Sequence, residues 1–293
     1  MEIKFGRDYF MPGIRFNENL LFSNYSYTYD QIKLAFRNRI FELSSFYLSL
    51  NSLAIEDTVY KRHLNEHRLS INLFNSGYIA INEVIVYGGV NRAMKPALLN
   101  PLLFYYPYQK NTRYFRSNSL ISMELFYQHR NLFGFLEFLV DDYQVDHSVS
   151  SDLEPNEYGY NLTIGIKQLL PGMNWSINHT KVSNRTYNVE VDVHEKYIYK
   201  NLPIGHYWGN NFWEISTKFS YANKKTFAEL RFSYLEYGDE ALYSAFNTDY
   251  LYYAVEEGYE ENFPFGTIHK QAGSMLTIFY SMGDLVIGLK IRF

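Results

Sequence analysis

Residues 158–167 read Tyr-Gly-Tyr-Asn-Leu-Thr-Ile-Gly-Ile-Lys, an uninterrupted alternation of large apolar with small or polar side chains. A period of two places the apolar set on one face of a β-strand and the polar set on the other. The stretch is longer than the average soluble strand of about five or six residues and has the length that a tilted strand needs to cross a bilayer. This pattern favours a membrane-crossing strand with a polar, lumen-facing side.

The same alternation recurs along the whole chain. It predicts thirteen strands, near residues 2–7, 29–37, 39–51, 66–74, 78–87, 119–129, 134–143, 156–168, 173–187, 211–222, 226–237, 268–281 and 285–293. A soluble β-sandwich also alternates, but the last strand ends on the aromatic Phe293, as outer-membrane barrels characteristically do. We therefore expect one all-β domain over residues 1–293, a transmembrane antiparallel outer-membrane β-barrel.

The composition agrees with a barrel in lipid. Aromatic residues make up 19% of the chain, with 29 Tyr and 23 Phe, although the mean hydropathy is only -0.29. Aromatic rings are typical of the two membrane–water interfaces of such barrels. The net charge of -4, without a basic stripe, does not indicate a nucleic-acid partner, and the absence of cysteine excludes disulfides and thiolate chemistry.

The amino-terminal residues 1–8 lack the apolar stretch of a signal peptide. An outer-membrane protein must be exported, so we expect the signal peptide and part of the native amino-terminal region to be missing from this sequence.

The connections between the predicted strands alternate between short turns and long loops. The long ones fall near residues 8–28, 52–65, 88–117, 143–156, 188–210 and 238–267, and a short turn is predicted at 281–284. Counting back from a periplasmic Phe293 places every long loop in the periplasm, the reverse of the usual arrangement. A fourteenth strand at residues 249–255 would restore the rule, and its β-forming residues lead us to predict one there.

The loop 88–117 is too long and too apolar for a plain solvated loop. We expect it to pack against the barrel mouth or lumen as a structural plug. An alternative is an aromatic shelf on which the sugar rings of a polymer stack.

No catalytic apparatus is recognised. His63-Leu64-Asn65-Glu66-His67 fits the H-x-x-E-H pattern of inverted zinc peptidases, but that chemistry needs a helix and the following residues alternate as a strand. We interpret the cluster as a loop edge. Asp141 and Asp142 should point to opposite faces and so cannot act together as an acid/base pair. We expect no catalytic residue, cofactor or metal.

Several short stretches resemble the Wzi-type capsule-assembly proteins, which are outer-membrane barrels of Gram-negative bacteria. They are Phe5-Gly6-Arg7-Asp8-Tyr9 with Pro12-Gly13 and Leu20-Leu21-Phe22-Ser23, His67-Arg68-Leu69 leading into Glu83–Gly89, Leu99-Asn100-Pro101, Glu137–Asp142, and Pro203–His206 with Gly209-Asn210. The matches span residues 5–210 and occur in order along the chain.

The resemblance implies an 18-stranded, non-enzymatic barrel that acts as a lectin in the assembly or anchoring of capsular or other surface polysaccharide. This chain shows only 13–14 strands, so it is a carboxy-terminal portion or a shorter relative. We expect polysaccharide and outer-membrane lipid as partners and a monomer as the oligomeric state. The candidate polysaccharide-binding residues, expected at the interior or mouth, are Arg7, Asp8, Arg92, Asn100, Glu124, Glu137 and Asp141.

Two other functions fit a barrel. The first is a porin or a channel for hydrophobic substrates, which would conduct ions across a planar bilayer. The second is a membrane-embedded lipid-modifying enzyme, which needs a His-Ser or His-Asp pair at one rim. A silent lumen together with glycan binding would favour the polysaccharide function over both.

Overall fold

The computed structural model describes residues 1–10, 12–13, 18–112, 115–144, 148–239, 241–282 and 285–293. Within them, thirteen strands form one antiparallel path in which each strand pairs with the next along the chain. They are β1 (Glu2–Asp8), β2 (Tyr29–Arg37), β3 (Phe41–Ser49), β5 (Thr58–Leu73), β6 (Gly77–Val90), β7 (Asn118–His129), β8 (Leu132–Asp142), β9 (Glu157–Leu170), β10 (Met173–Val182), β13 (Phe212–Ala222), β14 (Thr226–Gly238), β15 (Ile268–Met282) and β16 (Leu285–Arg292). The predicted all-β, antiparallel barrel architecture is confirmed.

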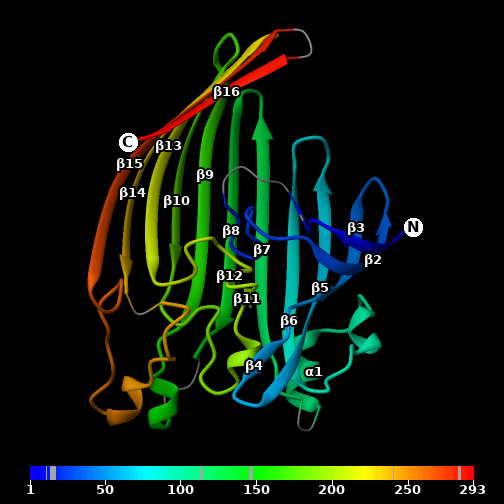
Figure 1. Cartoon of the computed structure of the whole chain (residues 1–293), viewed down its shortest axis with the longest axis vertical. Helices are drawn as coiled ribbons and strands as arrows, with labels where there is room; N and C mark the ends of the chain where they lie inside the picture. Colours follow the sequence, from blue (N-terminus) through cyan, green and yellow to red (C-terminus); the bar gives the residue numbers. More distant parts are fainter. Residues whose placement is uncertain (11, 14–17, 113–114, 145–147, 240, 283–284) are drawn as a thin grey trace.

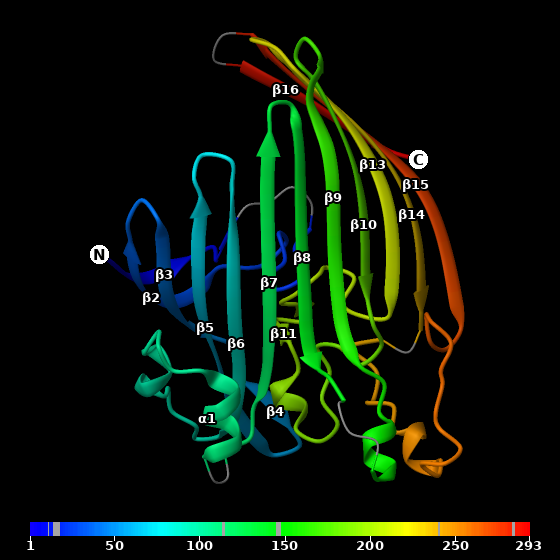
Figure 2. The same cartoon turned by 180° about the vertical axis from the view of Figure 1, so that it is seen from behind.

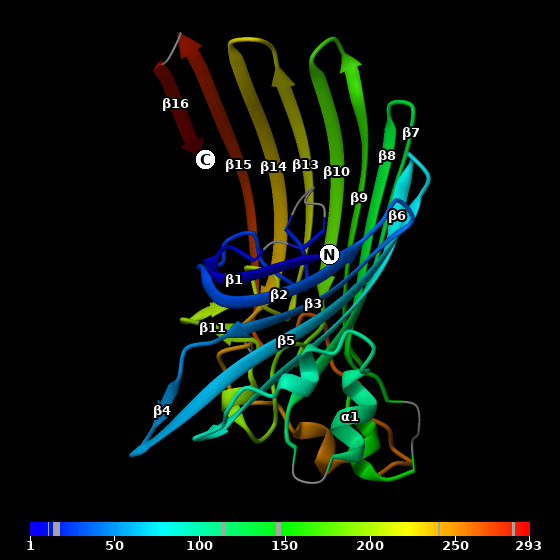
Figure 3. The ribbon, with the colours of Figure 1, turned by 90° about the vertical axis from the view of Figure 1, so that its right-hand side faces the viewer.

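The sheet curves into a trough that has β1 and β16 at its two edges (Figures 1 and 3). No pairing joins β1 to β16 in the part of the chain that the structure describes. No helix in those residues is long and apolar enough to span a membrane.

Alternation along each strand separates two faces, as the sequence predicts. On the convex face, large apolar side chains such as Ile81, Met123, Leu125 and Ile164 are exposed. On the concave face, polar side chains such as Glu124 and Asn161 are buried. The strands thus place apolar side chains on the outside and bury many polar side chains on the inside, which is unusual for a water-soluble protein.

The short turns gather at one end of the sheet and the long loops at the other (Figure 1). Of the predicted 281–284 turn, residues 283 and 284 lie outside the described part, and the flanking Met282 and Leu285 are paired in register. We call these the short-turn end and the long-loop end.

The predicted strand at 249–255 is wrong. Asp249–Tyr252 forms a 3-10 helix, η4, and turns follow it. β14 pairs directly with β15 from Gly238↔Ile268 onward, so no free sheet edge is left between them for another strand. Every long loop therefore lies at the same end of the sheet.

The predicted long loop at 52–65 is also wrong over most of its length. β4 (Leu53–Ile55) forms a hairpin with β5, which begins at Thr58 and runs for 16 residues. The residues His63–His67 therefore lie within a strand and not at a loop edge. His63 and His67 are on the convex face, whereas Glu66 is buried on the concave side.

The segment 88–117 does not plug the lumen. It contains η1 (Pro96–Leu99) and α1 (Tyr105–Asn111) and packs on the convex face of β5 and β6 (Figure 2). Leu98, Tyr105 and Phe115 from the segment form a buried cluster with Ile85 and Tyr87 of β6. Side chains at alternate positions of β6, such as Val84 and Val86, belong to a different cluster on the concave face.

Candidate functional site

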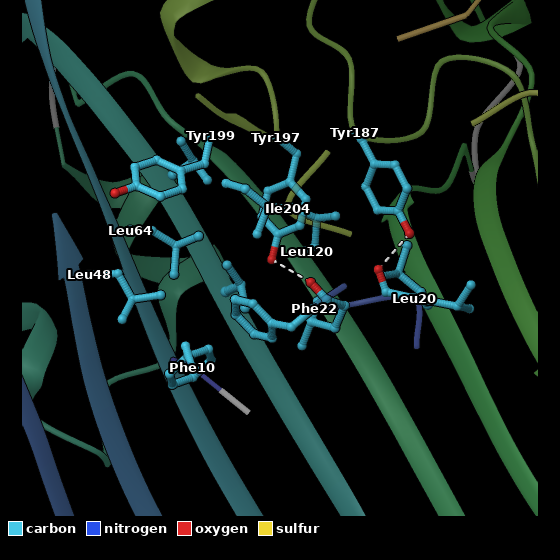
Figure 4. Packing of buried hydrophobic residues seen from close by; sticks show 14 of the residues in the cluster. Phe10, Leu20, Phe22, Leu48, Leu64, Leu120, Tyr187, Tyr197, Tyr199 and Ile204 are labelled. Atoms are coloured by element: carbon cyan, nitrogen blue, oxygen red, sulfur yellow. Dashed lines mark hydrogen bonds between the residues drawn. The ribbon is translucent and has the colours of Figure 1, made fainter. Parts of the chain in front are cut away.

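Two other segments fill the concave face, residues 18–28 after β1 and residues 183–211 between β10 and β13. Together we call them the plug. They contribute Leu20, Phe22, Tyr187, Tyr197 and Ile204 to a buried cluster with side chains of the sheet (Figure 4). The small sheet of β11 (Ile198–Tyr199) and β12 (Leu202–Pro203) belongs to the plug. Burial of each large apolar side chain contributes about 1.5–3 kcal/mol, so the plug is a packed core rather than a loose lid.

The two plug segments are hydrogen-bonded to each other. The Tyr187 hydroxyl donates to the Leu20 carbonyl at 2.7 Å, and the Tyr197 hydroxyl donates to the Leu21 carbonyl at 2.9 Å (Figure 4). The backbone N–H of Ser23 donates to the carbonyl of Ile204 at 2.6 Å. These bonds satisfy backbone groups that would otherwise be buried without partners.

Charged side chains of the sheet hold the plug in place. Glu137 on β8 accepts hydrogen bonds from the backbone N–H groups of Leu20 and Leu21 at 2.8 and 3.0 Å. Asp141 on the same strand accepts one from the N–H of Tyr187 at 2.6 Å. Two residues predicted to bind polysaccharide thus face the interior but are occupied by the protein's own backbone.

Arg62 on β5 is a cationic side chain that also holds the plug in place. Its buried guanidinium donates to the carbonyls of His194, Lys196 and Ile198 at 2.5, 2.6 and 2.8 Å. Sequence reasoning missed this residue because nothing local shows that three carbonyls more than 130 positions away surround it.

Glu124 takes part in a second buried network. Its carboxylate accepts two hydrogen bonds from Arg68, at 2.5 and 3.0 Å, and others from the Tyr78 hydroxyl at 2.9 Å and the Asn82 amide at 3.0 Å. The carboxylate is therefore fully engaged within the protein. It supports Arg68, which lines the cavity described next.

A cavity of about 480 Å³ lies on the concave face toward the short-turn end. We call it the charged cavity. Its walls carry three pairs of opposite charge: Lys33 with Glu2 at 3.1 Å, Arg37 with Glu42 at 2.6 Å, and Lys4 with the predicted site residue Asp8. The ring of Tyr9 lines the same space and is 57% exposed. The cavity combines many donors and acceptors with an exposed aromatic face and three ion pairs, and a further cation in its wall, Arg68, is paired with Glu124 behind it.

A smaller cavity of about 250 Å³ lies toward the long-loop end and is strongly acidic. Asp141, Asp142, Glu154, Glu157 and Glu190 line it, and Lys110 is also in its wall. A bulge between Val140 and Asp142 interrupts the pairing of β8 with β9, so the predicted separation of Asp141 from Asp142 is wrong: both line one cavity. Burial, aided by the negative charge of Asp142, raises the pKa of Glu154 to about 7.

The remaining predicted site residues lie outside the lumen. Arg7 is exposed on the convex face, where it forms two hydrogen bonds of 2.7 Å with Asp30. Arg92 belongs to the segment on β5 and β6 and donates to the Gly88 carbonyl at 3.0 Å. Asn100 is an exposed residue of the same segment.

The H-x-x-E-H pattern does not form a zinc site. His63 and His67 contact the carbonyls of Arg92 and Leu98, at 3.0 and 2.9 Å, while Glu66 lies on the opposite face of the strand. Within the described residues, no group of three or more His, Asp or Glu side chains is arranged to hold a metal ion.

No protein-family model and no curated protein sequence matches this chain. Among solved structures, the chain is similar to Wzi of Escherichia coli, described as an outer-membrane protein involved in group 1 capsule assembly and a carbohydrate-binding β-barrel. The TM-score is 0.61 at 10% identity, over 94% of this chain and 60% of that one. The chain thus spans less than two thirds of the length of Wzi. At this identity the likeness shows a shared fold, and the fold of this chain is that of an outer-membrane β-barrel.

Proposed function

We propose that this chain is a non-enzymatic outer-membrane barrel that binds surface polysaccharide and serves its assembly or anchoring, as a monomer. The fold likeness to a carbohydrate-binding barrel supports this proposal. The side chains on the convex and concave faces of the sheet support it independently.

The convex face supports insertion into a membrane. Ile79, Ile81, Met123, Leu125 and Ile164 are 37–52% exposed there, each at an outward position of its strand. A soluble monomer rarely exposes a continuous apolar surface of more than a few hundred Å², because such a surface aggregates in water. Lipid chains would cover this face.

The charged cavity is the observation that carries the binding proposal. Its paired cations and carboxylates can exchange hydrogen bonds with sugar hydroxyls, and charged partners make such bonds stronger than neutral ones. The exposed ring of Tyr9 offers a flat face on which the C–H face of a sugar ring can stack. Of the seven predicted binding residues, Asp8 lies on this cavity and is the one we retain as a direct contact, whereas Glu124 contributes by holding Arg68 in the cavity wall.

The plug favours binding over passage. It fills the concave face with packed aromatic side chains that are hydrogen-bonded to Glu137, Asp141 and Arg62. An open channel along this face would require these contacts to break. We therefore expect a lumen that does not conduct ions.

Glycan binding by the purified full chain in detergent tests the proposal. Tyr9→Ala and Asp8→Asn should each weaken binding of a surface-polysaccharide fragment by about tenfold, equivalent to ~1.4 kcal/mol. Arg7→Ala is the matched control, since Arg7 neighbours Asp8 but lies on the other face. Equal binding by all three variants would remove the charged cavity as the site. Ion conductance in planar bilayers without glycan binding would replace the proposal with a channel.

A further inference from the structure

On the convex face of β5 and β6, the outward side chains change from exposed and apolar to buried and largely polar partway along the strands. Toward the short-turn end their outward side chains are exposed and apolar, namely Leu69, Ile71, Ile79 and Ile81. Toward the long-loop end the outward side chains are buried, and many of them are polar: His63, Asn65, His67, Glu83, Ile85 and Tyr87. Polar groups placed in the hydrocarbon of a bilayer without partners are costly. This end of the two strands is therefore unsuited to direct contact with lipid chains.

Segment 91–117 covers these polar side chains. The Leu98 carbonyl contacts His67 Nε2 at 2.9 Å, and the Arg92 carbonyl contacts His63 Nε2 at 3.0 Å. Glu83 accepts hydrogen bonds from the backbone N–H groups of Tyr105 and Tyr106 at 2.7 and 2.8 Å. The segment thus supplies the hydrogen-bonding partners that lipid lacks. On the convex face of β5 and β6, the area that it covers starts where the exposed apolar side chains end.

The side of the segment that faces away from the sheet carries exposed apolar and aromatic residues. Leu102, Phe104 and Tyr106 are 76%, 72% and 53% exposed. The helix α1 of this segment lies beside β5 and β6 on the convex side of the sheet (Figure 2), and the outward side chains Leu69, Ile71, Ile79 and Ile81 of these strands are themselves exposed. Amphipathic rings at such a position are typical of the headgroup layer of a membrane.

The charge of the segment complements lipid headgroups. Residues 91–117 contain five basic residues, Arg92, Lys95, Lys110, Arg113 and Arg116, and no acidic residue, although the whole chain has a net charge of -4. Arg116 is paired with Asp192 at 2.9 Å, and Lys110, 5.3 Å from the centroid of the Tyr106 ring, also lines the edge of the acidic cavity. Basic residues near an anionic membrane surface are attracted to its phosphates.

We propose that residues 91–112 form an interfacial anchor that lies in the headgroup layer of the membrane. Leu102 and Phe104 enter the acyl boundary, and Lys95 and Lys110 meet anionic lipid phosphates. The anchor marks one edge of the hydrocarbon band on the convex face, at the level where Ile81 gives way to Glu83. This inference rests on the proposed membrane insertion, and the experiment below separates the two.

Because the chain has no cysteine, a nitroxide label can be placed at single introduced cysteines in the full chain. The sites are Phe104→Cys on the anchor, Met123→Cys on the outward face of β7, and Tyr9→Cys in the charged cavity. In vesicles of phosphatidylcholine and phosphatidylglycerol, collision rates with oxygen and with a water-soluble nickel chelate report depth. We expect the label at 123 to be deep, the label at 104 to be shallow but shielded from nickel, and the label at 9 to be fully accessible to nickel.

The outcomes distinguish failure of the interfacial anchor from failure of membrane insertion. If the label at 104 is as accessible to nickel as that at 9 while the label at 123 stays in lipid, the anchor is refuted and membrane insertion stands. If the label at 123 is itself accessible to nickel, membrane insertion fails and the anchor fails with it.

A second measurement tests the choice of lipid. A fluorophore attached to the thiol of the Phe104→Cys variant should be quenched more strongly by brominated phosphatidylglycerol than by brominated phosphatidylcholine at equal dilution in the same vesicles. Adding Lys95→Gln and Lys110→Gln should abolish that preference, whereas adding Lys224→Gln and Lys225→Gln, at a short turn, should preserve it. Equal quenching by the two lipids without these lysine substitutions would overturn the proposed contact with anionic headgroups.

Discussion

Arg68 on β5 and Glu124 on β7 are joined by two N–H···O bonds, of 2.5 and 3.0 Å, that reach across the intervening strand β6. Both side chains are almost fully buried on the concave face. Removing one partner of a buried pair leaves an uncompensated charge, which costs about 3–5 kcal/mol. Glu124→Leu should therefore lower the free energy of unfolding by about that amount in urea titrations of the detergent-solubilised barrel.

The double variant Arg68→Met, Glu124→Leu is the matched control for this pair. Replacing both charges with apolar groups of similar volume is often neutral or stabilising. It should recover most of the stability lost in Glu124→Leu. A double variant as unstable as the single one would show that the pair's wider contacts, with Tyr78 and Asn82, dominate instead.

A charge on the convex face should destabilise the barrel in lipid. Leu125→Arg and Ile164→Arg should each cost about 2–4 kcal/mol near the midplane, because the guanidinium would enter hydrocarbon. Folding into vesicles, followed by heat-modified mobility, measures the effect. Gln271→Arg is the control, since Gln271 is exposed on the concave side opposite Leu235. Equal folding of all three variants would contradict the assignment of the two faces.

Loss of the Glu137 charge should loosen the plug. Glu137→Gln weakens two buried hydrogen bonds to the N–H groups of Leu20 and Leu21, at a cost of about 1–3 kcal/mol. The amides of residues 20 and 21 should exchange with deuterium faster than in the parent, while those of β8 and β9 should not change. Tyr187→Phe removes a single hydroxyl donor from the same region and should have a smaller effect.

The free energy of unfolding should fall as pH rises through the neutral range, and Glu195 should contribute part of this fall. Burial, with the negative charge of Asp192, raises the pKa of the Glu195 carboxyl from 4.5 to about 8, although Arg116 and Arg92 oppose the shift. The folded protein holds this proton more tightly than the unfolded chain, so its contribution is complete below pH 4.5 and is lost as pH approaches 8.

Glu195→Gln should remove that component of the pH dependence of the unfolding free energy. The variant should be more stable than the parent at alkaline pH. The control is Glu256→Gln, which changes an exposed carboxylate of the loop between β14 and β15. An unchanged pH profile for Glu195→Gln would show that Glu195 does not contribute.

Local alternation determined the strands and the two faces of the sheet, because the direction of a side chain in a strand depends only on its position along that strand. The exception at the start of β5 has a physical cause. His63, Asn65 and His67 occupy outward positions that the anchor covers, so apolar side chains do not recur there and the pattern is lost. At 249–255 the β-forming residues are present, but the pairing of β14 with β15 leaves them no partner.

Only the tertiary structure decided which loop enters the lumen. Residues 88–117 are the more apolar candidate by sequence, yet residues 18–28 and 183–211 fill the concave face. The choice depends on contacts between groups far apart in sequence, such as Glu137 with Leu20 and Arg62 with Ile198. The same contacts make Glu137 and Asp141 structural and leave Asp8 on the open cavity, because a carboxylate that already accepts buried backbone hydrogen bonds has little capacity left for a ligand.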